Sequence, residues 1–446
     1  MKNLLTRWLP YLAVLVAIAV YTSEKWLSNS GHAEQARTVV TFWAFSYPAQ
    51  TMLELKTQFE QTHPDIRVDV QTVPWEHLQQ KTLWAIAANS NVPDVIVGSS
   101  EWLGGLVSAG ALEPLDTSEL GETFFQKYFP PALRIYQYPE IQSSSPSKGG
   151  LRQYGIPLDI DLMVVYYRSD ILDPLLEKKG WKSFPSTWDQ FLELGKTVCT
   201  EFQTSQPPVR YLFLDPEDPV PLSMAFFPSS GTKVLDDRME HAAFNCPAGI
   251  SAFAFFARLL TEGCAMRWER GIMEDPLVLL KTTRSLVTVS GPWYRKVLER
   301  RIPEQAGRWR IALFPRREPQ FPSSALGGAC LAIPYNAPHK REALALIRFM
   351  AQEEFALNYF RRVGSPPPQI SAWNDPVFSE PVAYFGGQRI YGVIREAIET
   401  AQPTQLIPNT QITRDCLRRA LKNIADGASI QPTVEKAAKE IERLLQ

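Results

Sequence analysis

The sequence has no excess of charge of either sign. Its 446 residues include 46 Lys and Arg against 47 Asp and Glu. This balance argues against partners that recognise a strong field, such as nucleic acid or an anionic membrane surface. Hydrophobic residues make up 45% of the chain and aromatic residues 11%, which argues against a disordered or fibrous protein. The sequence therefore predicts a globular protein of roughly two to three domain-sized units.

The sequence also lacks the short motifs that accompany common kinds of catalysis. It has no phosphate-binding glycine loop, no GxGxxG, no GxSxG and no HExxH. These absences predict no cofactor and no metal, and they argue against an enzyme. A pair of Asp or Glu side chains acting as acid and base remains open, because proximity in space is not readable from one sequence. A glycoside hydrolase is thus the remaining enzymatic alternative.

Cysteine is scarce, and its spacing fits no metal site. The five cysteines leave at least one free thiol in any disulfide pattern. The segment 247–263 is predicted to be one helix, which at ~1.5 Å per residue separates its two flanking cysteines too widely for a bridge. A bridge from Cys199 to either flanking residue is more plausible, and the choice stays open. The five cysteines are Cys199, Cys246, Cys264, Cys330 and Cys416.

The N-terminal residues resemble an export signal. Lys2 and Arg7 precede an apolar run from Trp8 to Tyr21. A basic flank before such a run is typical of a secretory signal, whereas a membrane-spanning helix needs about 20 apolar residues. Gly31 and Ala33 offer a cleavage site, although an uncleaved anchor also fits. We therefore expect a protein on the periplasmic or extracellular face of the cell membrane.

Strands and helices alternate from residue 37 onward. A β-branched run is followed by an apolar stripe with helical spacing, and this succession is repeated twice. Alternation of this kind predicts a mainly parallel sheet flanked by helices. The expected strands are 37–43, 66–73 and 93–98, and the expected helices are 48–61, 75–89 and 101–109.

From residue 154 onward, the sequence predicts helices, strands and a loop without the regular alternation of the first part. Thr187 and Gln190 form a capping box that begins a helix, and the proline-rich segment 207–228 reads as a loop. Residues 154–167 and 285–289 are strand-like. We expect one long helix over 341–361 and terminal helices over 388–400, 413–425 and 432–446.

A series of short motifs resembles the extracellular solute-binding proteins of ABC importers, in particular the maltose-binding-protein-like group. The motifs occur in the order expected for that group and span most of the exported portion. The segment 281–286 departs from the pattern that the group has before its Gly-Pro-Trp motif, which leaves the specificity open. The matching motifs are His63-Pro-Asp-Ile-Arg-Val68, Pro93-Asp-Val-Ile96, Gly110-Ala-Leu-Glu-Pro-Leu115, Tyr154-Gly-Ile-Pro-Leu-Asp159, Pro185-Ser-Thr-Trp-Asp189, Gly291-Pro-Trp293 and Gly364-Ser-Pro366.

The resemblance implies an α/β fold of two lobes, each a mixed sheet flanked by helices, joined at a hinge. It implies that residues 1–36 are a signal peptide or anchor, that 37–159 and 329–376 form lobe 1, and that 160–328 and 377–446 form lobe 2. The implied function is to capture a small polar solute in the cleft and deliver it to membrane permease subunits. We expect a carbohydrate ligand, no nucleic-acid partner and a monomer.

Ligands in open α/β folds gather beyond the carboxyl ends of the strands, which selects the candidate ligand-binding residues. Aromatic faces cover the apolar side of a sugar ring, while carboxylates accept hydrogen bonds from its hydroxyls. For Trp43, Asp159, Asp161 and Trp293, core packing or backbone hydrogen bonding is the competing interpretation. The candidates are Trp43, Tyr47, Ser99, Glu101, Asp159, Asp161, Trp293 and Gly328, with Trp268, Tyr384 and Arg414 as weaker ones.

Two alternative functions remain open at this stage. A membrane-tethered sensor would bind solute but signal to a partner instead of feeding an importer. A binder of a phosphorylated solute such as glycerol 3-phosphate would need basic residues in the cleft.

Overall fold

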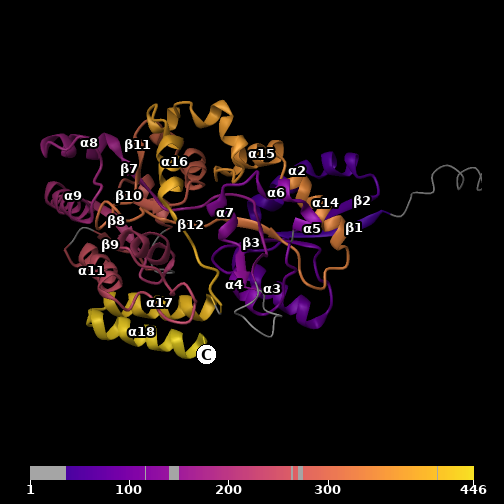
Figure 1. Cartoon of the computed structure of the whole chain (residues 1–446). Helices are drawn as coiled ribbons and strands as arrows, with labels where there is room; N and C mark the ends of the chain where they lie inside the picture. Colours follow the sequence, from indigo (N-terminus) through magenta and orange to yellow (C-terminus); the bar gives the residue numbers. More distant parts are fainter. Residues whose placement is uncertain are drawn as a thin grey trace, which may run out of the picture.

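The computed structural model describes residues 37–115, 117–139, 150–262, 265–269, 275–408 and 410–445. Within these ranges, no helix is both long and apolar enough to cross a membrane. The expected bridge partner Cys264 and the expected signal segment lie outside the described residues. The chain forms two bodies side by side, with the N-terminal strands in one of them (Figure 1).

Lobe 1 is built on a five-stranded sheet in the order β2-β1-β3-β13-β6. The strands β1, β2 and β3 run parallel, as the alternating sequence predicts, and β13 returns antiparallel beside β3. Its main elements are β1 (Thr38–Ala44), α2 (Ser46–Thr62), β2 (Ile66–Thr72), α3 (Trp75–Ala88), β3 (Val95–Ser99), α4 (Leu103–Ser108), β6 (Ile156–Pro157), β13 (Ala329–Ala332), α14 (Lys340–Met350) and α15 (Glu353–Val363). Smaller elements are α5 (Thr117–Leu120), α6 (Glu122–Phe125), α7 (Pro130–Arg134), β4 (Gln137–Pro139) and β5 (Leu151–Gln153).

Lobe 2 is built on a second five-stranded sheet in the order β11-β7-β10-β8-β9. Its strands are β7 (Val164–Arg168), β8 (Arg210–Leu214), β9 (Ala265–Arg267), β10 (Ser285–Ser290) and β11 (Trp309–Leu313). Its helices are α8 (Ser169–Lys178), α9 (Trp188–Glu201), η1 (Leu222–Phe226), α10 (Phe227–Ser230), α11 (Pro247–Thr261), α12 (Pro276–Lys281), α13 (Tyr294–Arg301), η2 (Pro303–Gln305), α16 (Ile390–Thr400), α17 (Thr410–Ala425) and α18 (Ile430–Leu445). β12 (Ala325–Leu326) and β14 (Gln402–Pro403) form a separate two-stranded sheet. Of the short helices, η3 (Ser371–Asn374) contacts α15 and η4 (Pro376–Phe378), and η5 (Ala383–Phe385) contacts β11.

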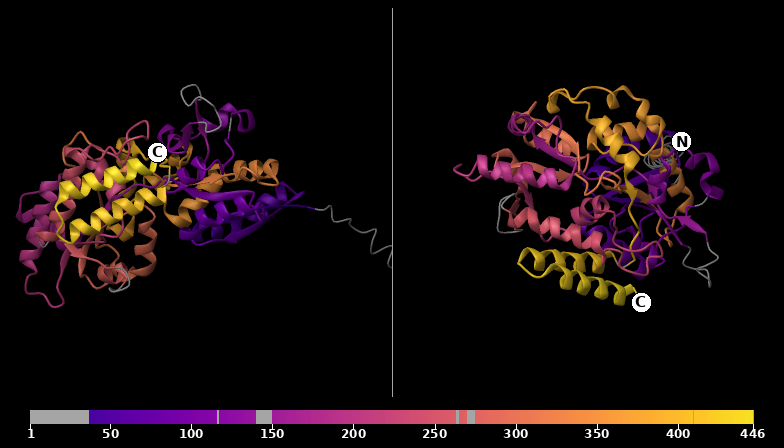
Figure 2. Two further views of the ribbon diagram at one scale, coloured as in Figure 1. Left: turned by 90° about the horizontal axis from the view of Figure 1, so that it is seen from below. Right: turned by 60° about the vertical axis from the view of Figure 1, so that its left-hand side comes forward.

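Helices cover both faces of each sheet. On lobe 1, alternate β1 residues pack toward α2, α14 and α15 on one face and toward α3 on the other. On lobe 2, one face of β7 packs in the same apolar cluster as α8, α9, α11 and the terminal pair α17–α18. Figure 2 shows this pair as two long helices lying along the outside of the molecule. Because successive side chains of a strand point to opposite faces of the sheet, β1 and β7 each contribute residues to the apolar cores on both sides of their sheet.

Three expectations for secondary structure are wrong. The strand-like stretch 154–167 holds two strands, β6 and β7, separated by residues 158–163, where the chain passes from one sheet to the other. The expected loop 207–228 contains β8 and η1, because its prolines flank a buried run, Arg210–Leu214, which pairs with β10. The expected helix 341–361 is two helices, α14 and α15, interrupted at residues 351–352. The capping box is confirmed, since the Gln190 backbone N–H donates to Thr187 Oγ1 at 3.3 Å.

The expected bridge between Cys199 and Cys246 is not present in the structure. Cys246 is a free thiol at the start of α11, and its Sγ lies 3.7 Å from Thr232 Oγ1. Cys330 and Cys416 are buried thiols within the cores of the two lobes. The alternative, Cys199 with Cys264, falls outside the described residues.

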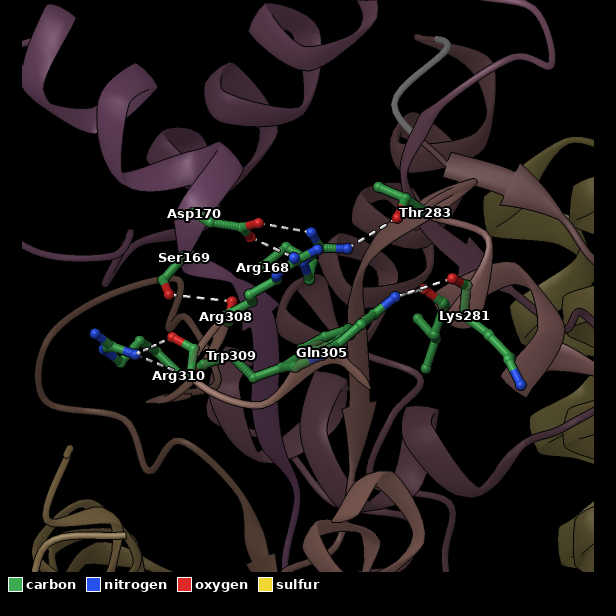
Figure 3. Close-up of polar contacts among 11 residues, drawn as sticks. Arg168, Ser169, Asp170, Lys281, Thr283, Gln305, Arg308, Trp309 and Arg310 are labelled. Carbon is green, nitrogen blue, oxygen red and sulfur yellow. Dashed lines mark hydrogen bonds and ion pairs between the residues drawn. The ribbon is translucent and has the colours of Figure 1, made fainter. Parts of the chain in front are cut away.

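A buried arginine, Arg168, holds the lobe 2 sheet together at the carboxyl end of β7 (Figure 3). The side chain of Arg168 is 4% exposed and donates to both carboxylate oxygens of Asp170, at 2.8 and 2.7 Å, and to Thr283 Oγ1 at 2.9 Å. Beside it, the Trp309 indole N–H donates to Gln305 Oε1 at 2.9 Å, and the Gln305 amide donates to the carbonyl of Lys281 at 2.9 Å. These bonds join β7, β11 and the turn that precedes β10.

Replacing Asp170 by alanine is expected to lower the free energy of unfolding by about 1–3 kcal/mol, because Arg168 would stay buried without its carboxylate partner. Chemical denaturation measures the difference. The control is Glu201→Ala, which removes a solvent-exposed partner of Lys178 and should cost less than about 1 kcal/mol. Equal costs for the two variants would show that the Arg168 network adds nothing to stability.

Candidate functional site

The two lobes face each other across two adjoining hollows, together called the inter-lobe cleft. The inner hollow has Ser100 and Glu101 of lobe 1 opposite Val220 and Met224 of lobe 2. The outer hollow lies between the start of α3 and the start of α17, with Trp75 and Trp102 in its lobe 1 wall. Pro219, Thr410 and Arg414 line both hollows.

An ion pair joins the lobes inside the cleft. Arg414 Nη1 of α17 lies 2.9 Å from Glu101 Oε2, which follows β3. The guanidinium also stands 5.5 Å from the ring centroid of Trp75. Burial raises the pKa of Glu101 above its ordinary value, and the charge of Arg414 opposes this rise. The structure thus brings together two of the residues that the sequence proposed, one from each lobe.

Asp161 and Trp293 form a second group, at the hinge side of lobe 2. Asp161 accepts hydrogen bonds from the Leu162 backbone N–H at 2.9 Å and from the Trp293 side chain. A Cβ atom at Gly291 would lie 2.1 Å from Asp161 Oδ1 and 2.5 Å from Trp293 Nε1. Only glycine leaves this space, so the Gly-Pro-Trp motif brings an indole and a carboxylate together.

The Asp161 carboxylate has neutral hydrogen-bond donors as its partners among the described residues. Burial raises its pKa well above the ordinary value, and the nearby carboxylates of Asp159 and Glu101 raise it further. Since the charge of Glu101 raises the pKa of Asp161, this group lies close enough to the Glu101–Arg414 ion pair to interact with it electrostatically. Because no protein cation pairs with Asp161 among the described residues, a solute hydroxyl could donate a hydrogen bond to this carboxylate without displacing a cation.

The hinge lies directly beside Asp161. The backbone of Asp161 exchanges hydrogen bonds with Gly327, at 2.9 and 2.8 Å, so the two expected hinge crossings run side by side. Asp159 is buried and accepts from the Ala329 N–H at 2.7 Å and from the Tyr359 hydroxyl at 3.2 Å. Gly328 has φ +145°, and a Cβ there would lie 2.4 Å from the Asp159 carbonyl oxygen. Asp159 and Gly328 thus hold the hinge backbone.

Of the remaining candidates, the structure places Ser99 next to Glu101 and the others apart from these groups. Trp43 lines a different groove, which shares no lining residue with the cleft hollows. Tyr47 is half-buried on α2, and Ser99 accepts a hydrogen bond from the Glu101 N–H at 3.2 Å. Trp268 extends β9 through its N–H bond to Leu214, and the buried Tyr384 donates to the Ile302 carbonyl at 2.9 Å. A ligand role for these residues stays a prediction.

Several cleft residues were missed by the sequence analysis. Trp75 and Trp102 line the outer hollow, and Met224 lines the inner hollow. A Cβ at Gly327 would lie 2.6 Å from Ser100 Oγ and 3.2 Å from Met224 Cε, so the hinge and both lobes meet there. Trp75 and Trp102 follow the carboxyl ends of β2 and β3, a signal that could have identified them. Met224 lies in 207–228, a segment whose prolines predict a loop.

Comparison with known proteins finds similar sequences and a similar fold over most of the chain. A sequence model described as bacterial extracellular solute-binding protein matches residues 54–386. A putative binding protein of Brucella abortus is 24% identical over 346 residues, covering 76% of this chain and 78% of the relative. The arabinooligosaccharide-binding protein of Halalkalibacterium halodurans is 23% identical over 407 residues, covering 86% of each. The solved GacH receptor of Streptomyces glaucescens superposes with a TM-score of 0.75 at 19% identity, covering 92% of this chain and 98% of that one. The two-lobed α/β fold is thereby confirmed.

The Asp159→Asn variant is expected to lose a pH-dependent contribution to stability. Burial raises the pKa of Asp159 to about 6, so the folded state binds its proton more tightly than the unfolded state does. The contribution of Asp159 therefore grows as pH falls from 7.5 to 4, by roughly 2 kcal/mol. Denaturation of both proteins across this range measures the change in their difference. A difference that stays constant with pH would contradict the assignment.

The Gly104→Leu variant is expected to hold the lobes apart. A Cβ at Gly104, on α4, would lie 2.5 Å from the Ile407 carbonyl oxygen in the segment leading to α17. Small-angle scattering should show a larger radius of gyration than for the unchanged protein. The control is Gly392→Leu on α16, where a Cβ would meet no described atom within 4 Å. An unchanged radius for both variants would argue against this contact as a limit on closure.

Proposed function

Since the chain belongs to the bacterial extracellular solute-binding proteins, we propose that it captures a small carbohydrate in the inter-lobe cleft and delivers it to the permease of an ABC importer. Relatives and structural neighbours support this ligand class by their names, which include an arabinooligosaccharide-binding protein and a receptor solved with acarbose. The protein would act as a monomer outside the membrane and without turnover of its ligand.

The observation that carries the proposal is the pairing of Asp161 with Trp293 beside the hinge. The carboxylate accepts hydrogen bonds from sugar hydroxyls, and the indole covers the apolar face of a pyranose ring. Both side chains already contact each other, so little ordering of side chains opposes binding. Trp75 and Trp102 add aromatic surface to the outer hollow.

Closure of the lobes supplies the second part of the proposed mechanism. Rotation at 158–161 and 327–329 would bring the two walls of the cleft together around a solute, the hinge-closure type of motion. The Glu101–Arg414 ion pair would form on closure and break on opening, because its partners belong to different lobes. Exclusion of water from the closed cleft strengthens the hydrogen bonds to the solute.

The charges in the cleft favour a neutral sugar over a phosphorylated solute. The cations that line the two hollows within the described residues are Lys233, Arg414 and Arg418. Each of them is ion-paired, with Asp237, Glu101 and Asp415 respectively. A phosphate group would have to break one of these pairs and would also lie near the Asp161 carboxylate.

A thermal-shift screen tests the proposal with maltose, maltotriose, lactose, arabinooligosaccharides, acarbose and glycerol 3-phosphate. A true ligand at a hundredfold excess over its dissociation constant adds about 2.7 kcal/mol of stability, which raises the melting temperature measurably. Asp161→Ala and Trp293→Ala should each weaken binding of that ligand at least tenfold by calorimetry, corresponding to about 1.4 kcal/mol or more. Glu201→Ala, on the surface of lobe 2, is the matched control. Absence of any shift, or hydrolysis of the bound sugar, would overturn the proposal.

A further inference from the structure

A second groove lies on lobe 1, apart from the cleft. It runs between α3 and the neighbouring strands β1 and β2, which Figure 1 shows within lobe 1. Lys81, Trp84, Ala85 and Ala88 share one face of α3, since they are spaced by three, four and seven residues. The groove is lined by Thr41, Trp43, Gln71, Lys81, Trp84, Ala85, Ala88, Ser90, Asn91 and Val92.

Two polar groups in this groove lack a hydrogen-bond or ion-pair partner among the described residues, and one large side chain in it is exposed. Trp84 is 66% exposed, the largest exposed fraction among the large hydrophobic side chains described. The buried indole N–H of Trp43 has no acceptor among the described residues. Lys81 Nζ lies 3.8 Å from the ring centroid of Trp43, and no ion pair joins it to a carboxylate in the described part of the chain.

Single exposed hydrophobic side chains are common and need no explanation, so Trp84 alone carries little weight. The comparison with Lys179 and Trp181 is more informative. There the ammonium also lies over an indole, at 5.3 Å, but it is ion-paired with Glu193 at 2.7 Å. Lys81 has the aromatic partner without the anion. An unpaired cation, an indole donor without an acceptor and an exposed indole therefore meet in one groove.

These groups match one kind of ligand. An ammonium attracts an anion, an exposed indole covers an apolar ring face, and amide and hydroxyl side chains bond to ring hydroxyls. Gln71, Asn91, Thr41 and Ser90 supply the amides and hydroxyls around the groove. The two alanines of α3 leave space beside Trp84. A pyranose ring that carries a carboxylate has an anion, an apolar face and ring hydroxyls, and so offers a partner to each of these side chains.

We infer that this groove binds an acidic sugar unit, of the uronic acid class, within a glycan chain. Lys81 pairs with the carboxylate, Trp84 covers the ring, and Asn91 and Gln71 bond to hydroxyls. The site is independent of the inter-lobe cleft and would hold the protein to acidic polysaccharide outside the membrane while the cleft serves transport.

Affinity electrophoresis in gels containing polygalacturonate, alginate or hyaluronate tests the inference, with neutral galactan as the comparison. The unchanged protein should be retarded by at least one acidic glycan and not by galactan. Trp84→Ala and Lys81→Met should each weaken retardation at least tenfold. Both side chains reach solvent, and thermal melts would check that each variant is folded.

Two controls separate the groove from other surfaces. Leu53→Ala removes another exposed hydrophobic side chain, 46% exposed on α2, and should leave retardation unchanged. Trp293→Ala should also leave it unchanged, because that residue lies at the hinge side of lobe 2 and does not line this groove. Retardation of the Trp84 and Lys81 variants equal to that of the unchanged protein, loss of retardation in Trp293→Ala, or no retardation by any acidic glycan would each overturn the inference. Free galacturonate as a competitor then distinguishes a single acidic sugar from a longer chain as the bound species.

Discussion

The hinge backbone is the constraint on which the remaining structure depends. The chain passes between the lobes at 158–161 and 327–329, and these passages hydrogen-bond to each other. The buried carboxylate of Asp159 ties them together, because it accepts from the Ala329 N–H and from the hydroxyl of Tyr359 on α15. Burying a carboxylate without a cation is costly, and the raised pKa of Asp159 reflects that cost. These bonds tie the hinge to lobe 1 and thereby fix the point about which lobe 2 can turn.

Close approach at glycines shapes the cleft and the hinge beside it. Gly291, Gly327 and Gly104 each bring a neighbour to a distance that a side chain would forbid. The first brings Asp161 against Trp293, the second brings Ser100 and Met224 to the hinge, and the third brings α4 against the segment before α17. The cleft is therefore formed by backbone contacts as well as by the side chains that line it. A glycine in these positions has a steric role, since only Gly328 of the hinge and cleft glycines named here has a positive φ.

The distribution of charge distinguishes the two candidate binding surfaces of the molecule. Among the described residues, the cations that line the cleft are paired with carboxylates, and Asp161 beside the hinge has only neutral hydrogen-bond donors as partners. In the second groove, on lobe 1, the situation is reversed, because Lys81 has an aromatic partner and no ion pair within the described part of the chain. An acceptor-rich cleft suits hydroxyl donors, whereas a donor-rich groove suits an acidic group. Two regions with opposite hydrogen-bonding character on one chain are consistent with two different ligands.

The sequence by itself determined the fold class, the order of the first strands and helices, and the family. These follow from local periodicity and from short motifs in a fixed order, which do not depend on distant contacts. It also identified Glu101 and Trp293 as candidates from strand ends, Asp161 from the expected hinge crossing, and Arg414 as a weaker candidate. Only the tertiary structure decided that Trp43 lies under α3 instead of in the cleft, since a strand residue can face either side of a sheet. It also decided that Glu101 pairs with Arg414, 313 residues away in the chain, because such a contact depends on how the two lobes pack.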